Sequence, residues 1–175
     1  MSRSLGNVIA DSLQLSVGYA DRLLKEVDAN RFARFAAPGG QTIESNHPAF
    51  IYGHLCIYAP RIIAQLGRDD LSISVADVFE RTCSKDAKCV DDPDASIYAS
   101  MDETLETFRG GYENVMTALR EASDETLQQK NPSEGRMAEL FPTLGSMHGF
   151  YVGGHMMMHM GQLSAWRRMQ GMGPA

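Results

Sequence analysis

The stretch LGNVIADSLQLSVGYADRLLKEV, residues 5–27, carries the pattern that decides the fold. Its apolar side chains recur at intervals of only three and four residues, and the set is Leu5, Ile9, Leu13, Val17, Ala20, Leu24 and Val27. Because an α-helix has about 3.6 residues per turn, these side chains share one helix face. The stretch therefore predicts a long amphipathic helix that buries this face.

Three further segments show the same periodicity and cover residues 48–66, 97–119 and 144–169. Pro48 suits the first position of a helix, and Ser96 suits a position that caps one. No stretch shows the apolar–polar alternation of a half-buried strand. The sequence thus predicts an all-α fold built on four long helices.

Long connections join the last three of these segments. Residues 68–95 contain a capping-box pattern at Ser74, which predicts one short helix over residues 75–81. Residues 123–142 form a second, polar connection. Long crossovers are typical of bundles in which neighbouring helices run parallel. We expect a four-helix bundle that fills a single domain, residues 1–175.

Composition and charge exclude several classes of function. The net charge of −6 argues against sequence-independent nucleic-acid binding, which needs a basic surface. No apolar run approaches the roughly 20 residues of a membrane span, and the first residues lack the apolar core of a secretion signal. The sequence predicts a cytoplasmic protein without a nucleic-acid or membrane partner.

The chain has three cysteines. Cys56 lies in an apolar helical stretch, and Cys83 and Cys89 flank a short polar segment. Reduced thiols are the expected state in the cytoplasm, with a disulfide or redox pair between Cys83 and Cys89 as the alternative. Their spacing does not match a zinc-knuckle pattern.

His155 and His159 are the strongest functional signal. Four residues is just over one helical turn, so both imidazoles project from one face and can reach the same metal ion. Gln162 falls in the same sector, and His54 lies close to the buried stripe of its own predicted helix. Burying these polar groups without partners is costly, and a shared metal satisfies the imidazoles. We expect His54, His155 and His159 to be metal ligands, with Gln162 beside them.

The other two histidines are expected outside this site. His148 precedes His155 by about 10 Å along a helix axis, and His47 stands at a helix cap before Pro48. Met156 follows His155, where a zincin protease needs its glutamate base, so that mechanism is excluded. The sequence identifies no catalytic acid or base.

The fourth predicted helix is rich in methionine, which favours core packing and a homodimer interface over metal ligation. Near its end, Arg167 and Arg168 are expected on solvent. The pocket is expected near the ends of 53–54 and 154–155, with residues 68–95 as part of its wall.

The chain resembles the DinB/YfiT-like superfamily of metalloenzymes. The resemblance rests on the motif NHPAFIYGHL, residues 46–55, and on GHMMMHMGQL, residues 154–163, which is similar to the family's His-x-x-x-His-x-Gly-Gln-Leu signature. It implies an up-down-down-up bundle, often dimeric. It also implies a divalent metal on His54, His155 and His159.

The resemblance further implies a metal-dependent enzyme that uses a low-molecular-weight thiol, such as bacillithiol or mycothiol, for transfer to a small-molecule substrate. Hydrolysis remains open, since metals activate both thiols and water. Zinc and nickel suit imidazole ligands, and iron or manganese is also compatible. The alternative is a non-catalytic dimeric binding or stress-response module with a structural or vestigial metal site.

Overall fold

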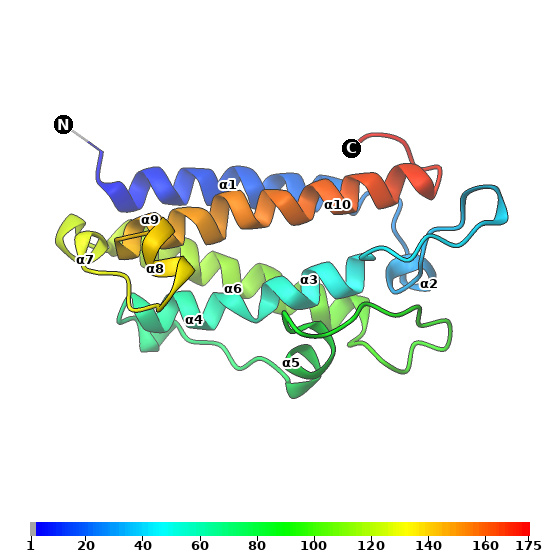
Figure 1. The fold of residues 1–175 in the computed structure, drawn as a ribbon, viewed down its shortest axis with the longest axis horizontal. Helices are drawn as coiled ribbons and strands as arrows, with labels where there is room; N and C mark the ends of the chain where they lie inside the picture. Colours follow the sequence, from blue (N-terminus) through cyan, green and yellow to red (C-terminus); the bar gives the residue numbers. More distant parts are fainter. Residues whose placement is uncertain (1–2) are drawn as a thin grey trace.

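The computed structural model describes residues 3–175, and this part of the chain is all-helical without strands. The long segments lie side by side along the longest axis of the molecule (Figure 1). They are α1 (Leu5–Leu23), α3 and α4 (Pro48–Cys56 and Tyr58–Gln65), α6 (Met101–Glu121), and α9 and α10 (Leu144–Gly149 and Met156–Met169). The prediction of an all-α fold is confirmed.

Shorter elements connect them. These are α2 (Ala29–Phe32), α5 (Asp77–Cys83), α7 (Asp124–Gln128), α8 (Arg136–Leu140), two 3-10 turns (Pro38–Gly40 and Asp69–Leu71) and the π-helical turn η3 (Phe150–His155). Within residues 3–175, no helix combines the length and apolar character needed to cross a membrane.

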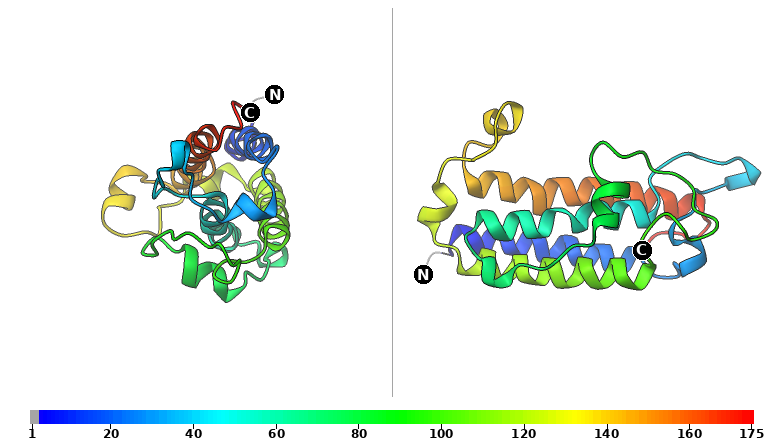
Figure 2. Two further views of the ribbon diagram at one scale, coloured as in Figure 1. Left: turned by 90° about the vertical axis from the view of Figure 1, so that its right-hand side faces the viewer. Right: turned by 90° about the horizontal axis from the view of Figure 1, so that it is seen from below.

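The long helices, which Figure 2 shows in end view, enclose one continuous core of buried side chains. Helix α6 packs against α1, α3 and α4, and α10 packs against α1 and α3. The largest fully buried apolar side chains include Leu13, Tyr52, Phe108, Tyr112 and Trp166. Each such side chain contributes about 1.5–3 kcal/mol on burial, so packing of these stripes holds the helices together.

Helix α1 ends at Leu23, earlier than the predicted stripe that reaches Val27. Arg167 from α10 donates from Nη1 to the carbonyl of Leu23 at 2.8 Å and also to that of Lys25. The expectation that Arg167 is solvated is wrong, because its side chain is only 1% exposed. Carbonyls left free at the helix end bind this guanidinium, which is why it is buried.

The predicted helix over residues 48–66 is divided into α3 and α4 at Ile57. Pro60 explains the break. A proline has no N–H to donate to the carbonyl four residues earlier, and its ring crowds that carbonyl, here the one of Cys56.

Helix α6 begins at Met101 with Ser100 as its cap, later than the Ser96 cap predicted. The buried Asp92 carboxylate accepts the backbone N–H groups of Ser96, Ile97 and Tyr98 at 2.9–3.2 Å. These bonds satisfy the backbone in a non-helical turn and postpone the helix.

The short predicted helix in 68–95 exists as α5 but starts at Asp77, with Ala76 in the cap position and no side-chain cap. The Ser74 capping box is therefore wrong. Asp77 occupies the first turn, where a carboxylate interacts favourably with the helix dipole. Helices α7 and α8 lie in a connection for which the sequence predicted only a polar segment.

Candidate metal centre

His54 is placed by a close contact between α3 and α5. A Cβ atom at Gly53 would lie 2.5 Å from Sγ of Cys83, so only glycine permits this approach. The carbonyl of Cys83 thereby reaches Nδ1 of His54 at 2.7 Å. Because a carbonyl only accepts, Nδ1 carries the proton and Nε2 of His54 keeps its lone pair.

His155 and His159 come from the junction of η3 and α10. The predicted continuous helix over 144–169 is interrupted here by the wider π-helical turn, which the sequence analysis did not foresee. Gly153 in this turn packs closely on α1, since an added Cβ would lie 2.9 Å from Oγ of Ser12. Turns of this kind recur at functional sites, and this one ends at His155.

The three predicted ligands converge. One ring nitrogen from each of His54, His155 and His159 lies within 4.8 Å of the others. The Nε2 atoms of His155 and His159 are 3.2 Å apart. Two nitrogens bound to one tetrahedral zinc ion at about 2.0–2.1 Å lie roughly 3.3 Å apart, so the spacing fits a shared ion.

Burial keeps these imidazoles neutral. Desolvation lowers the pKa of His54 and of His159. Desolvation, together with the neighbouring His159 and His54, lowers the pKa of His155 to about 3. The neutral imidazole is the form that binds a metal, so all three side chains are in the ligating state near pH 7.

Gln162 lies beside the ligands, as predicted. Its Oε1 atom accepts from Nδ1 of His159 at 3.0 Å and from Nδ2 of Asn46 at 3.2 Å. The first contact leaves Nε2 of His159 free to face the cluster. Asn46 was missed by the sequence analysis, because helical periodicity does not say which residue before a helix faces another helix.

His155 lacks a comparable partner. Its Nδ1 atom is buried without a hydrogen-bond partner among the described residues. A neutral imidazole that binds a metal through Nε2 carries its proton on Nδ1, so His155 lacks the acceptor that orients His54 and His159.

A pocket of about 350 Å³ opens onto the cluster. It is lined by Asn46, Phe50, His54, Tyr58, Ser84, Lys85, Ala87, His155 and His159. The segment 84–87 belongs to the connection 68–95, which was predicted as part of the pocket wall. The three histidines thus face accessible space, as a reactive site requires.

Aromatic rings surround the histidines. Phe50 lies parallel to His54, with ring centroids 6.4 Å apart and an interplanar angle of 5°. Tyr58 packs against His54 and His155 with centroids 5.1 and 4.9 Å away, and Tyr151 also contacts His155. These rings hold the imidazoles in place and give the pocket an apolar wall.

The remaining histidines lie outside the cluster, as predicted. His47 caps α3 by accepting the backbone N–H of Phe50 at Nδ1, while Nε2 donates to the carbonyl of Val90 at 2.9 Å. His148 in α9 is completely buried and has no hydrogen-bond partner at either ring nitrogen among the described residues.

The cysteines are free thiols, and the disulfide alternative for Cys83 and Cys89 is wrong. All three are buried, and burial raises the pKa of Cys83 and of Cys89 to about 11. Burial also raises the pKa of Cys56. Thiols with raised pKa values are weak nucleophiles near neutral pH, and none of them belongs to the three-histidine cluster.

Comparisons of the chain with protein-family models, with curated proteins and with solved structures found no match.

Proposed function

We propose that this chain is a DinB/YfiT-like metalloenzyme with an up-down-down-up four-helix bundle. Its support is the side-by-side arrangement of the long segments, α1, α3–α4, α6 and α9–α10 (Figure 1). The long connection between α4 and α6 fits the same topology.

The observation that carries the proposal is the convergence of His54, His155 and His159 at the floor of a pocket. We assign them as ligands of one divalent ion, with zinc or nickel favoured by imidazole and iron or manganese also compatible. When bound, such an ion acts as a Lewis acid that lowers the pKa of a coordinated thiol or water. Three protein ligands leave room for a substrate atom.

The proposed reaction transfers a low-molecular-weight thiol, of the bacillithiol or mycothiol kind, to a small electrophilic substrate. The thiol must come from solution, because the chain's own cysteines are buried and their pKa values are raised. A cytoplasmic location, where small thiols stay reduced, belongs to the proposal.

Residues around the three histidines orient and shield these ligands in the proposed reaction. Gln162 and the Cys83 carbonyl each accept an Nδ1 proton, which keeps Nε2 of His159 and of His54 directed at the cluster. Phe50 and Tyr58 limit the access of water to the imidazoles. These contacts preorganise the ligands before substrate enters.

The second candidate is a non-catalytic dimeric binding or stress-response module. The observation that favours it is the absence of any carboxylate among the residues that line the histidine pocket. Without a nearby base, the chain itself supplies no proton acceptor for hydrolysis, so the metal serves structure or is vestigial in this alternative.

Both candidates include a homodimer. Met156 and Met160 are buried in the core, but Met157 and Met158 of α10 are 39% and 55% exposed. On α1, which packs against α10, Val8 and Leu15 are 56% and 66% exposed. Covering these apolar side chains with a second copy removes them from water. Sedimentation should show a mass about twice that of the 19.3 kDa chain.

A chelation experiment separates the two candidates. Metal is removed from the protein, and helicity, melting temperature and thiol transfer to a panel of electrophiles are then measured. In the enzyme proposal, activity is lost and returns with metal, while most helicity remains because the core holds the helices. Unfolding of the chelated protein at room temperature, or a complete lack of thiol transfer by the metal-loaded protein, supports the structural module instead.

A further inference from the structure

The pocket that contains all three histidines has one formally charged side chain among the described residues that line it, Lys85. The rest of the lining consists of aromatic rings, small side chains, the Asn46 amide and the three imidazoles, with no carboxylate among them. Lys85 itself is exposed to solvent, so its ammonium group lies where an entering ligand can reach it.

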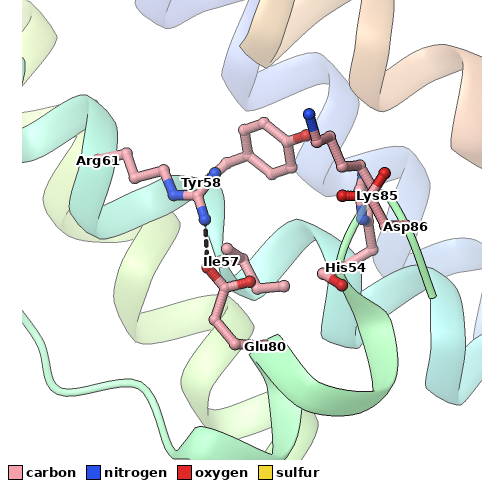
Figure 3. Close-up of a pocket in the computed structure, with 8 residues that line it drawn as sticks. His54, Ile57, Tyr58, Arg61, Glu80, Lys85 and Asp86 are labelled. Atoms are coloured by element: carbon pink, nitrogen blue, oxygen red, sulfur yellow. Dashed lines mark hydrogen bonds and ion pairs between the residues drawn. The ribbon is translucent and has the colours of Figure 1, made fainter.

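The Lys85 side chain has no ion pair or hydrogen bond within residues 3–175, whereas two nearby cations, Arg61 and Lys88, are paired. Arg61 forms an ion pair with Glu80, which is drawn as a dashed line in Figure 3. Lys88 in the same loop lies 3.3 Å from Glu44. Asp86 lines only the neighbouring pocket that Figure 3 shows. The Lys85 ammonium group is therefore available to a ligand.

The hydroxyl of Tyr58 is a second polar group without a hydrogen-bond partner among the described residues. Tyr58 and Lys85 line both the histidine pocket and the neighbouring pocket, as does His54. A carboxylate has two oxygens that accept several hydrogen bonds. An ammonium group and a phenolic hydroxyl on the same pocket wall are suitable donors for it.

We infer that the histidine pocket selects a small molecule that carries a carboxylate, which Lys85 and Tyr58 bind while the reacting end of the molecule faces His54, His155 and His159. This inference rests on the proposed function, in which a small thiol or its acceptor occupies the pocket. The chain as a whole has a net charge of −6, which repels anions, so a carboxylate ligand depends on this local cation.

The test uses two thiols that differ in charge, 3-mercaptopropionate and 2-mercaptoethanol. Calorimetry measures both dissociation constants for the zinc-loaded wild-type protein and for Lys85→Gln, Lys85→Arg and Lys88→Gln. Lys88→Gln is the matched control, because it removes the same charge from the same loop but does not line the histidine pocket. The quantity compared is the ratio of the two dissociation constants, which cancels the intrinsic difference between the thiols.

We expect Lys85→Gln to shift this ratio by about threefold against the carboxylate, the size typical of one solvent-exposed charge pair. Lys85→Arg should keep most of the preference, and Lys88→Gln should leave the ratio unchanged. An equal ratio in wild type and Lys85→Gln, or an equal shift in Lys88→Gln, overturns the inference while leaving the metal–thiol function standing.

If neither thiol binds, the thiol part of the proposed function fails, and propionate decides the inference. In metal-free protein, propionate should then shift the amide resonances of residues 84–87 in the wild type and not in Lys85→Gln. No shift in the wild type, or the same shift in the variant, overturns the inference.

Discussion

His148 and His155 lie on one continuous helical segment and differ in what surrounds them. Both are buried. Burial alone lowers the pKa of His148 to about 4, and burial together with His159 and His54 lowers that of His155 to about 3. His155 faces two other imidazoles and a pocket, whereas His148 has no polar partner at all among the described residues. Desolvation alone therefore does not mark a candidate metal ligand. What distinguishes His155 is that His159 of the same segment and His54 of α3 converge on it.

The largest difference between the two positions should appear in metal affinity. His159→Ala should weaken zinc binding about 100–1,000-fold, because four-ligand zinc sites bind with about 10–16 kcal/mol, or about 2.5–4 kcal/mol per ligand. The matched variant His148→Ala should leave zinc affinity unchanged. Competition with a chromophoric chelator measures both. Comparable losses of zinc affinity in His159→Ala and His148→Ala would contradict the assignment of His159 but not His148 as a zinc ligand.

Acid should expose the cost of burying His148. Between pH 6.5 and about 4 the unfolded chain binds a proton at this residue that the folded chain does not, so stability falls as the pH falls. His148→Leu removes this contribution. Between pH 7 and pH 4.5 the wild type should therefore lose about 2.5 kcal/mol more unfolding free energy than His148→Leu does. Urea unfolding at each pH measures it, and a constant gap would contradict the burial argument.

Gln162 tests whether the orientation of a ligand matters as well as its presence. Gln162→Leu removes the acceptor for Nδ1 of His159, and zinc affinity should fall about 10–100-fold, the usual cost of losing such a partner. Gln162→Glu keeps an acceptor and should retain most of the affinity. Unchanged zinc affinity in the leucine variant would mean that packing alone orients His159.

Asn46 should have the smallest effect. Its side chain donates a hydrogen bond to Gln162, so Asn46→Ala removes one hydrogen bond that acts on His159 only through another side chain. We expect a loss of about threefold in zinc affinity, near the low end of a single hydrogen bond. In a Gln162→Leu background the same substitution should have no effect, and an additive loss there would show that Asn46 acts independently.

Much of the fold follows from local pattern, and its exceptions have local causes. The apolar stripes predict α1, α6 and the 144–169 segment, because helix burial repeats every three to four residues. The stripes do not predict which side chain binds the free backbone groups at each helix end. The Asp92 carboxylate that delays α6 is close in sequence, whereas Arg167 at the end of α1 comes from the other end of the chain.

The candidate site divides in the same way. The spacing of His155 and His159 is a property of one helix and was predictable, and the placement of His54 beside them is confirmed by the structure. The π-helical turn before α10, the carbonyl of Cys83 and the side chain of Asn46 were not predictable. Each of these features depends on how separate segments pack together, and the periodicity of a single helix carries no information about that packing.

The central claim is that three imidazoles bind one metal ion, and metal content with ligand spectroscopy tests it most directly. Protein prepared without an affinity tag is dialysed against micromolar zinc, and X-ray absorption then counts the nitrogen ligands. The account predicts one zinc ion per chain in wild type and in His148→Ala, with three imidazole nitrogens at about 2.0–2.1 Å, and loss of the ion in His54→Ala, His155→Ala and His159→Ala. Substoichiometric zinc in the wild type, or full retention in the three ligand variants, would contradict it.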